Sequence, residues 1–314
     1  MALTGVAVSR DQDVDKVRAS FRWLAAKPSR APRYPSPLRY PGAKRKLVAH
    51  IRELLVTNQI RPALFVEPFA GGASVSVSLL WEDRVQSIGL IDSDPLVSAF
   101  WKCVFWDTQW LTEQVKSVPL TVDTWKKMRA ANPRDTRGRA LKCLYLNRTS
   151  FSGILNRRAG PIGGMSQEGT YKIGCRFDRL NLADRLREAG TLRDRVAFVR
   201  GTDWQLALQW VEAQQASGNL PKAFYYFDPP FFDKAFRLYS RYFDEEDHLR
   251  LRDALNGLDA SWILSYDRLD RVQELYGDLA GGAWSVGGDY TAAAGAERRS
   301  TEAMLTNLPI RPFK

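Results

Sequence analysis

Cysteine and histidine are scarce in this chain of 314 residues, which contains three cysteines and two histidines. Cys103, Cys143 and Cys175 lie far apart and form no CxxC pair. This spacing argues against a zinc site or a disulfide framework, and it predicts a cytoplasmic protein with free thiols. His50 and His248 fall in segments with helical patterning, where we expect surface side chains rather than ligands, so no metal is predicted.

Long apolar runs are also missing. No stretch approaches the roughly 20 consecutive apolar residues that a membrane-spanning helix needs. The first residues, MALTGVAVSRDQDVDK, lack a basic start followed by an apolar core, so no secretory signal is predicted. Hydrophobic residues make up 45% of the chain, which is typical of a globular protein, and we expect no membrane partner.

Acidic residues are under-represented in two stretches of a chain whose net charge is +11. Residues 121–200 contain 18 Lys and Arg against 7 Asp and Glu, and residues 1–52 contain 12 against 3. A basic excess confined to two stretches favours a polyanionic partner, because phosphate contacts supply most of the non-specific affinity for nucleic acids. A basic face that is only solvated is the alternative that charge alone leaves open.

Apolar runs alternate with segments of helical patterning along most of the chain. Strands are expected at 64–68, 85–92, 196–200, 222–230 and 261–267, with a last one at 301–309. Helices are expected at 43–58, 70–80, 95–106, 203–215 and 246–258. Alternation of this kind is typical of an α/β fold with a parallel sheet.

Two stretches interrupt this rhythm and define the expected domain organisation. Prolines at positions 28, 32, 35 and 37 predict an extended or disordered lead-in over residues 1–36. Residues 107–195 are basic, irregular and mostly helical in pattern, and they include the glycine-rich stretch 157–171. We therefore predict one α/β domain formed by residues 37–106 and 196–314, with residues 107–195 as an inserted helical module.

The segment FVEPFAGGAS (65–74) places a glycine-rich turn between a strand and a helix. Glycines let the backbone approach a ligand closely, and the helix N-terminus offers unpaired N–H groups. The pattern is neither GxGxxG nor a P-loop, so alone it is weak evidence for a nucleotide cradle. Asp92, at the end of the next strand, is placed to accept hydrogen bonds from both ribose hydroxyls. The alternative for Asp92 is to cap the helix that begins near Pro95, a role that Asp94 serves equally well.

The segment YYFDPPFF (225–232) places an acidic residue at the end of another apolar strand. Two prolines after Asp228 fix a rigid turn, which aims the Asp228 carboxylate and the Pro229 carbonyl outward, and the ring of Phe231 follows. This set suits a planar amine, because two acceptors take the two amino hydrogens while a ring stacks on the base. A simple turn is the alternative interpretation of these residues alone.

A lysine also stands at the start of an expected helix, in the segment PLRYPGAKRKL (37–47). Lys44 at this position is either a ligand-binding group or a solvated lysine on an amphipathic helix. For this segment alone the second interpretation is the simpler one. Lys44 therefore gains meaning only together with the two motifs described above.

Together these segments resemble the Dam family of DNA adenine methyltransferases, which use S-adenosylmethionine (AdoMet), over roughly residues 37–310. The similar segments, in order, are RYPGAK (39–44), FVEPFAGGAS (65–74), IDSDP (91–95), LYLNRTSFSG (144–153), DPPF (228–231) and WILSYD (262–267). Each motif alone is weak evidence, whereas the whole set in the family's order is specific. The chain departs from the family pattern at Phe231, where tyrosine is usual, and at Ala43, where glycine is usual.

The resemblance implies a Rossmann-like AdoMet-dependent methyltransferase sheet with an inserted target-recognition module. It also implies methyl transfer from AdoMet to the exocyclic amino group, N6, of an adenine flipped out of duplex DNA. Asp92 is then expected to hold the ribose of AdoMet, and Lys44 its methionine carboxylate. The full set of expected cofactor-binding residues is Tyr40, Lys44, Glu67, Phe69, Ala70, Gly71, Asp92 and Asp228. The expected catalytic residues are Asp228, Pro229, Pro230 and Phe231.

Double-stranded DNA is the partner that the resemblance implies, and a monomer is expected. The expected DNA-binding residues are Asn147, Arg148, Arg157 and Arg158. Arg157 and Arg158 begin the glycine-rich stretch, which we interpret as a hairpin that enters a groove, with a disordered surface loop as the alternative. An RNA adenine methyltransferase and a non-catalytic nucleic-acid-binding protein are the alternative functions. The motifs leave open whether the role is restriction–modification, phage protection or housekeeping.

Overall fold

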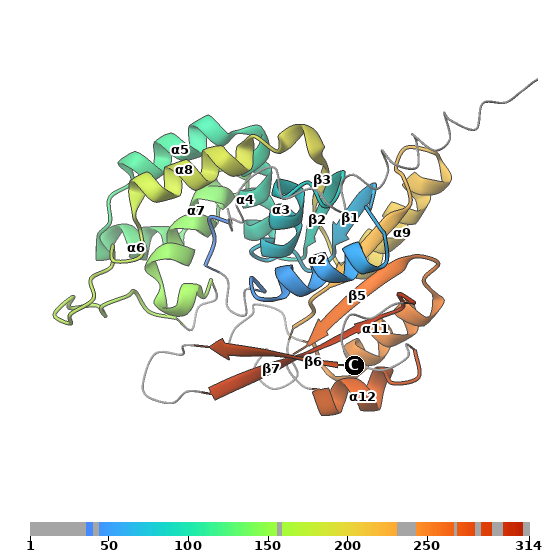
Figure 1. The fold of residues 1–314 in the computed structure, drawn as a ribbon. Coiled ribbons are helices and arrows are strands. Elements are labelled where there is room, and N and C mark those ends of the chain that lie inside the picture. The colour runs from blue at the N-terminus through green and yellow to red at the C-terminus, as the bar shows by residue number, and fades with distance from the viewer. Residues whose placement is uncertain are drawn as a thin grey trace, which may run out of the picture.

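The computed structural model describes residues 36–39, 44–155, 159–230, 243–266, 269–279, 284–290 and 298–309. A seven-stranded sheet forms in the order β3-β2-β1-β4-β5-β7-β6 (Figure 1). Neighbouring strands from β3 to β5 are parallel, and β7 is antiparallel to both β5 and β6. The strands are β1 (Leu64–Glu67), β2 (Ser87–Asp92), β3 (Val196–Gly201), β4 (Ala223–Phe227), β5 (Ser261–Tyr266), β6 (Trp284–Tyr290) and β7 (Arg298–Thr306). The predicted α/β, Rossmann-like sheet is confirmed.

Successive strand residues enter two hydrophobic cores, one on each face of the sheet. In β1, Phe65 belongs to one core, whereas Leu64 and Val66 belong to the other. The first core is completed by α2 (Leu47–Thr57), α3 (Ser74–Trp81) and α4 (Pro95–Trp106). The second is completed by α9 (Trp204–Ala216), α11 (Glu245–Gly257) and α12 (Leu269–Tyr276). Helices therefore cover both faces, as the continuous apolar runs of the parallel strands require.

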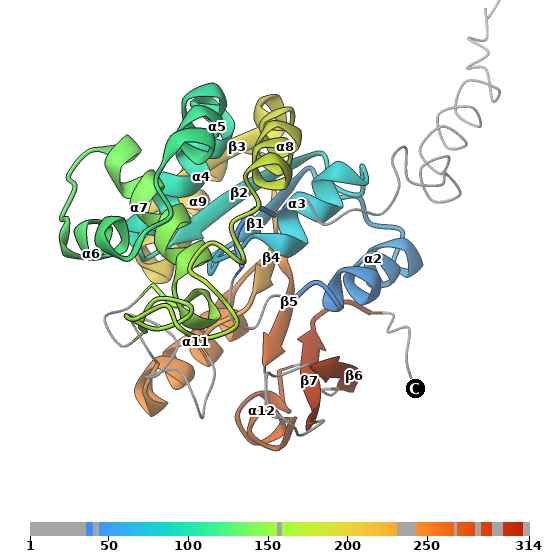
Figure 2. The ribbon, with the colours of Figure 1, turned by 90° about the vertical axis from the view of Figure 1, so that its left-hand side faces the viewer.

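The insertion follows α4 and is mostly helical, as predicted. It contains α5 (Thr108–Ser117), α6 (Val122–Ala130), α7 (Thr136–Thr149) and α8 (Arg179–Gly190), with short 3-10 helices at Phe151–Gly153 and Arg193–Arg195. Figure 2 shows α5 and α8 side by side, and α7 lies against α4. Trp125, Leu144 and Leu182 of the insertion are buried in the same core as α4. The insertion thus extends the first core of the sheet instead of forming one of its own.

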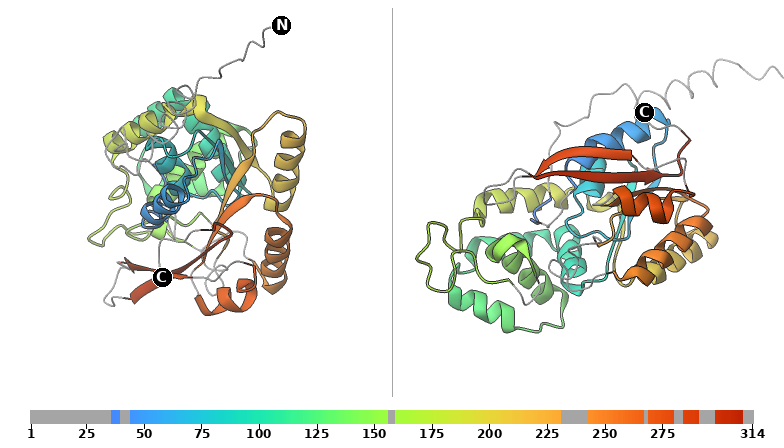
Figure 3. Two further views of the ribbon diagram at one scale, coloured as in Figure 1. Left: turned by 45° about the vertical axis from the view of Figure 1, so that its right-hand side comes forward. Right: turned by 90° about the horizontal axis from the view of Figure 1, so that it is seen from below.

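Several elements differ from the sequence-based prediction. The helix expected at 43–58 begins at Leu47, whereas α12 and β6 were not expected at all. β6 pairs with β7 at the edge of the sheet remote from β3 (Figure 3). The hairpin expected within 157–171 is not seen in its described part, where the chain forms turns and an isolated bridge joins Ser150 to Pro161.

Two further expectations concern single residues. His248 is buried rather than at the surface, and its Nδ1 lies 2.7 Å from the Tyr266 hydroxyl, so α11 uses it to pack against β5. Ser36 is fully buried, so the folded region includes the last residue of the predicted lead-in; residues 1–35 lie outside the described ones. None of the helices within the described ranges is long and apolar enough to cross a membrane.

Candidate active site

Three carboxylates lie at the carboxyl ends of three neighbouring strands. Glu67 is the last residue of β1, Asp92 is the last residue of β2, and Asp228 follows the last residue of β4. Because β1 pairs in parallel with both β2 and β4, the three strand ends meet at one edge of the sheet. This edge is where ligands bind in open α/β sheets.

Asp92 is held by the glycine-rich turn that follows β1. Its Oδ2 accepts a hydrogen bond from the backbone N–H of Gly71 at 2.8 Å, and its Oδ1 accepts one from that of Asp94, also at 2.8 Å. Asp94 caps α4, because its carboxylate accepts from Leu96 N. The capping role that the sequence left open for Asp92 is thus filled by Asp94. Burial, together with the charge of Asp94, raises the pKa of Asp92 to about 7.

The turn itself approaches the end of β2 closely. Gly71 has a φ of 45° and Ala73 a φ of 43°, both in the left-handed region. Glycine adopts this conformation without a Cβ penalty, whereas Ala73 is strained in it. The Ala70 N–H donates to the carbonyl of Ile91, and Trp101 Nε1 of α4 donates to the carbonyl of Gly71 at 2.9 Å. The turn is therefore fixed from both β2 and α4.

Glu67 is the most deeply buried of the three carboxylates. It is 4% exposed, and its Oε2 accepts a hydrogen bond from Ser76 N in the first turn of α3 at 3.2 Å. Burial and the charges of Asp228 and Asp92 together raise the pKa of Glu67 to about 8, although its hydrogen bonds with Ser76 lower it. Burial thus favours the protonated form of Glu67, and a cationic ligand group beside it would favour the ionised form.

Asp228 and Lys44 form a buried ion pair. Lys44 Nζ lies 3.2 Å from Asp228 Oδ1 and 2.7 Å from Glu302 Oε2 of β7, and Lys44 is 4% exposed. Burial alone lowers the pKa of Lys44, but the Asp228 and Glu302 carboxylates raise it above its ordinary value. The ammonium group of Lys44, near the start of the described chain, thus bridges two carboxylates from its C-terminal part.

A hydroxyl pair supports Asp228 from the other side. Ser265 Oγ of β5 donates to Asp228 Oδ1 at 3.0 Å, and the Tyr226 hydroxyl of β4 lies 2.8 Å from Ser265 Oγ. The pKa of Asp228 is raised to about 6, because burial and the Glu302 charge raise it by more than Lys44 and Ser265 lower it. Lys44 and Ser265 both contact Oδ1 of Asp228, whereas no side chain among the described residues is seen to bind its Oδ2.

The structure brings most of the expected site residues to this edge. Lys44, Glu67, Ala70, Gly71, Asp92 and Asp228 all lie in the segments described above. Phe69 is half-buried and packs against Trp204 and Phe243, with ring centroids 6.2 Å and 5.5 Å away, on the second core. Pro229 is buried and Pro230 half-buried. Tyr40, Phe231, Arg157 and Arg158 lie outside the described residues.

Sequence reasoning missed Glu302 and Ser265. Ser265 lies in WILSYD, a segment that resembles a family motif. The motif could have drawn attention to Ser265, but nothing in it predicts the contact with Asp228. Glu302 lies in a segment expected only to be a strand, and no local pattern links it to a lysine 258 residues earlier. The expected partner of Lys44 was the methionine carboxylate of AdoMet, whereas its described partners are Asp228 and Glu302.

Asn147 and Arg148, which the sequence suggested as DNA-binding residues, are both buried. Asn147 is 0% and Arg148 8% exposed, and the hydrogen bonds of both side chains end on backbone carbonyls or amides of residues 37, 39 and 153. The expectation of direct DNA contact does not fit this burial. Their side chains instead join α7 to the segment that precedes Lys44.

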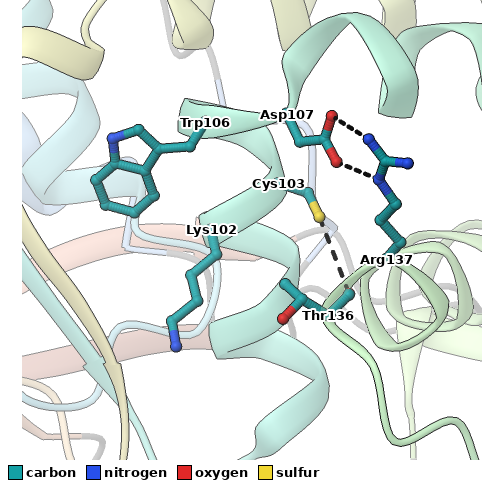
Figure 4. Close-up of a pocket in the computed structure, with 6 residues that line it drawn as sticks. All are labelled: Lys102, Cys103, Trp106, Asp107, Thr136 and Arg137. Carbon is teal, nitrogen blue, oxygen red and sulfur yellow. Dashed lines mark hydrogen bonds and ion pairs between the residues drawn. The ribbon is translucent and has the colours of Figure 1, made fainter.

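A separate cavity of about 580 Å³ lies between the end of α4 and the start of α7 (Figure 4). It is lined by Lys102, Cys103, Trp106, Asp107, Thr136 and Arg137. Arg137 is paired there with Asp107 through two contacts of 2.5 Å and 3.0 Å. This cavity lies at the C-terminal end of α4, whereas Asp92 adjoins its N-terminal end, about 15 Å away along the helix axis. It is therefore not part of the candidate active site.

Comparison with known proteins adds two findings. Residues 40–286 match the family model described as D12 class N6 adenine-specific DNA methyltransferase. The chain is also 25% identical over 244 residues to the Type II methyltransferase M.MjaIII of Methanocaldococcus jannaschii, in an alignment that covers 71% of this chain and 79% of that protein. The segment that the family model matches, residues 40–286, includes Lys44 and all three carboxylates at the strand ends.

Proposed function

This chain belongs to the D12 class of N6 adenine-specific DNA methyltransferases, and from this premise we propose that it transfers the methyl group of AdoMet to an adenine held at Asp228. The family resemblance expected from the motifs is confirmed, and the protein is an adenine-specific DNA methyltransferase with DNA as its substrate. The observation that carries the proposal for the site is the meeting of Asp228 with Asp92 and Glu67 at three adjacent strand ends.

The chemistry of the glycine-rich turn fits AdoMet. Each oxygen of Asp92 accepts one backbone N–H and keeps a further lone pair, which suits the two ribose hydroxyls. Gly71 brings the backbone close without a side chain in the way. Glu67 adds a buried carboxyl group beside the turn. When bound, AdoMet supplies a methyl group on a cationic sulfur, which is reactive without further activation.

Asp228 addresses the substrate rather than the cofactor in this proposal. Its Oδ2 and the Pro229 carbonyl accept the two amino hydrogens of the flipped adenine, which directs the nitrogen lone pair toward the methyl group. Positive charge develops on the adenine nitrogen during transfer, and the fixed Asp228 carboxylate stabilises it. Lys44 and Ser265 hold Oδ1 in place and keep Asp228 ionised. Positioning and electrostatic stabilisation then provide most of the rate enhancement of methyl transfer, so Asp228 need not be a strong base.

Methyl transfer from tritiated AdoMet tests the function directly. Duplex DNA and an RNA duplex of the same sequence are offered side by side. We expect label in the adenines of the DNA only. Label in the RNA alone would support the RNA methyltransferase, and a folded, DNA-binding protein without any transfer would support the non-catalytic alternative.

The pH dependence of transfer should report the Asp228 carboxylate. A protonated Asp228 loses an acceptor, so the rate falls as the pH decreases through the pKa of about 6. Replacing Glu302 with glutamine removes a negative charge that raises this pKa, so the acid limb of the profile should move to lower pH. Single-turnover rates between pH 5 and about 8 give the profile. Glu246→Gln, an exposed carboxylate on α11, is the control; equal profiles for both variants would remove Glu302 from the site.

A further inference from the structure

Residues 36–39, here called the strap, run between the insertion and the glycine-rich turn. The strap is the short dark-blue segment beside α7 in Figure 1. Ser36 is fully buried, and Leu38, which is 2% exposed, belongs to the first hydrophobic core. A stretch without helical or strand structure is thus buried at the junction of the two parts of the molecule, where its backbone groups need partners.

Asn147, near the C-terminal end of α7, supplies these partners at one end of the strap. Its Oδ1 accepts from the Arg39 N–H at 2.8 Å, and its Nδ2 donates to the Arg39 carbonyl at 2.8 Å. The side-chain amide therefore pairs with Arg39 as a neighbouring strand would. Nδ2 also donates to the carbonyl of Gly153 at 3.1 Å. The Gly153 position is equally tight, because a Cβ there would lie 2.3 Å from the Arg39 carbonyl oxygen.

Arg148 and Arg185 hold the other end. Arg148 donates from Nε, at 2.9 Å, and from Nη2 to the carbonyl of Pro37, and Arg185 of α8 donates to the carbonyl of Ser36 at 3.4 Å. No carboxylate among the described residues is seen to pair with Arg148. Burial and the neighbouring arginines lower the pKa of Arg148 to about 9. Keeping its guanidinium ionised in this buried position therefore costs free energy.

The opposite side of the strap contacts the cofactor turn. Ser36 Oγ donates to the carbonyl of Gly72 at 2.5 Å, and the preceding Gly71 is the residue whose N–H binds Asp92. A short hydrogen-bonded path thus runs from Arg148 through Pro37 and Ser36 to the turn that holds Asp92.

We propose that Asn147 and Arg148 are positioning residues for AdoMet binding, which act through the strap on the glycine-rich turn. The proposal rests on the proposed function, because it takes this turn to be the AdoMet cradle. It assigns Asn147 and Arg148 of the insertion to the cofactor site instead of to DNA binding. The insertion then sets the geometry of the site from outside the sheet.

The test compares Arg148→Met with Arg179→Met. Arg179 is a matched control in the same insertion, because its guanidinium also makes two hydrogen bonds to the backbone. They go to the carbonyls of Val115 and Val118, both at 2.6 Å, and not to the strap. Each protein is measured for AdoMet affinity by calorimetry without DNA, for DNA affinity and for thermal stability. Ser36→Ala is the second variant, since it removes only the contact with Gly72. Arg148→Lys keeps the charge and one donor.

We expect Arg148→Met to weaken AdoMet binding about tenfold and Ser36→Ala severalfold, with partial recovery in Arg148→Lys and DNA affinity unchanged. Arg179→Met should lose stability and keep its AdoMet affinity. Wild-type AdoMet affinity in Ser36→Ala would overturn the proposal, even if Arg148→Met fails to fold. Weaker DNA binding with normal AdoMet binding in Arg148→Met would return this residue to the DNA interface.

The wild-type protein separates this proposal from the proposed function. If the wild type binds AdoMet and methylates DNA while the strap variants match Arg179→Met, the strap proposal alone fails. If the wild type does not bind AdoMet, the assignment of the cradle fails, and the strap proposal fails with it.

Discussion

Replacing Asp228 with alanine is expected to reduce methyl transfer by about 10²–10³-fold or more and to leave AdoMet binding close to that of the wild type. The reason is that the proposed function has Asp228, which follows β4, facing the substrate amine, and Asp92 of β2 holding the ribose. Alanine removes both the acceptor for the amino group and the negative charge that stabilises the transition state. Lys44 retains Glu302 at 2.7 Å, so its charge stays partnered in the variant.

A tritium-transfer assay beside calorimetric AdoMet binding measures the two effects separately. Asp203→Ala is a matched control, because Asp203 also follows a parallel strand, β3, and accepts a hydrogen bond from Gln205 N at the start of α9. This control should lose some stability and keep its activity. Substantial residual transfer in Asp228→Ala would contradict the catalytic assignment. A parallel loss of AdoMet binding would move Asp228 into the cofactor site.

Replacing Asp92 with alanine is expected to weaken AdoMet binding tenfold or more. Losing a hydrogen bond to a charged group costs roughly 1.5–3 kcal/mol, and each 1.4 kcal/mol is about a factor of ten in affinity. Because Asp92 also fixes the Gly71 N–H, the alanine variant loosens the turn as well as removing the acceptor. Asp92→Asn keeps the shape of the side chain and should lie between the alanine variant and the wild type.

The pKa of Asp92, about 7, adds a second signature to this prediction. As the pH rises through this value the carboxylate ionises, gains acceptor strength, and AdoMet binding should tighten. Asp92→Asn should lose this pH dependence. Asp94→Ala removes the cap of α4, which costs about 1 kcal/mol of stability. At a pH well above the pKa of Asp92, where this carboxylate is ionised in both proteins, the variant should keep an AdoMet affinity near that of the wild type. An unchanged dissociation constant in Asp92→Ala would reduce Asp92 to a turn-stabilising residue.

The sequence predicted those parts of the fold that depend on local patterns. Apolar runs that stop at Glu67, Asp92 and Asp228 identify buried strands, and parallel strands bring such endings together without further information. Pro95 after Asp94 likewise marks the start of α4, and the structure has Pro95 in its first turn. Each of these features depends on a few consecutive residues, so a local sequence pattern is enough to predict it.

Contacts between distant segments were beyond this reasoning. Glu302 and Lys44 meet only because β7 inserts beside β5, and nothing near either residue encodes that order. Asn147 and Arg148 were found through a family motif, but the motif did not tell which side of α7 they face. His248 looked like a surface residue in an amphipathic helix, and it is buried because the Tyr266 hydroxyl offers it a partner across α11 and β5. Burial of polar groups therefore depended on partners that only the tertiary structure supplies.

Base-resolved sequencing of DNA from cells that express the protein tests whether it methylates adenine in DNA. The cells should lack other adenine methylation, and cells that express Asp228→Ala serve as the matched control. We expect N6-methyladenine at one recurrent sequence motif in the cells with the wild-type protein and none in the control. Unmodified adenine throughout the DNA, with the wild-type protein folded and AdoMet present, would contradict this expectation, as would methylation that persists in the Asp228→Ala cells.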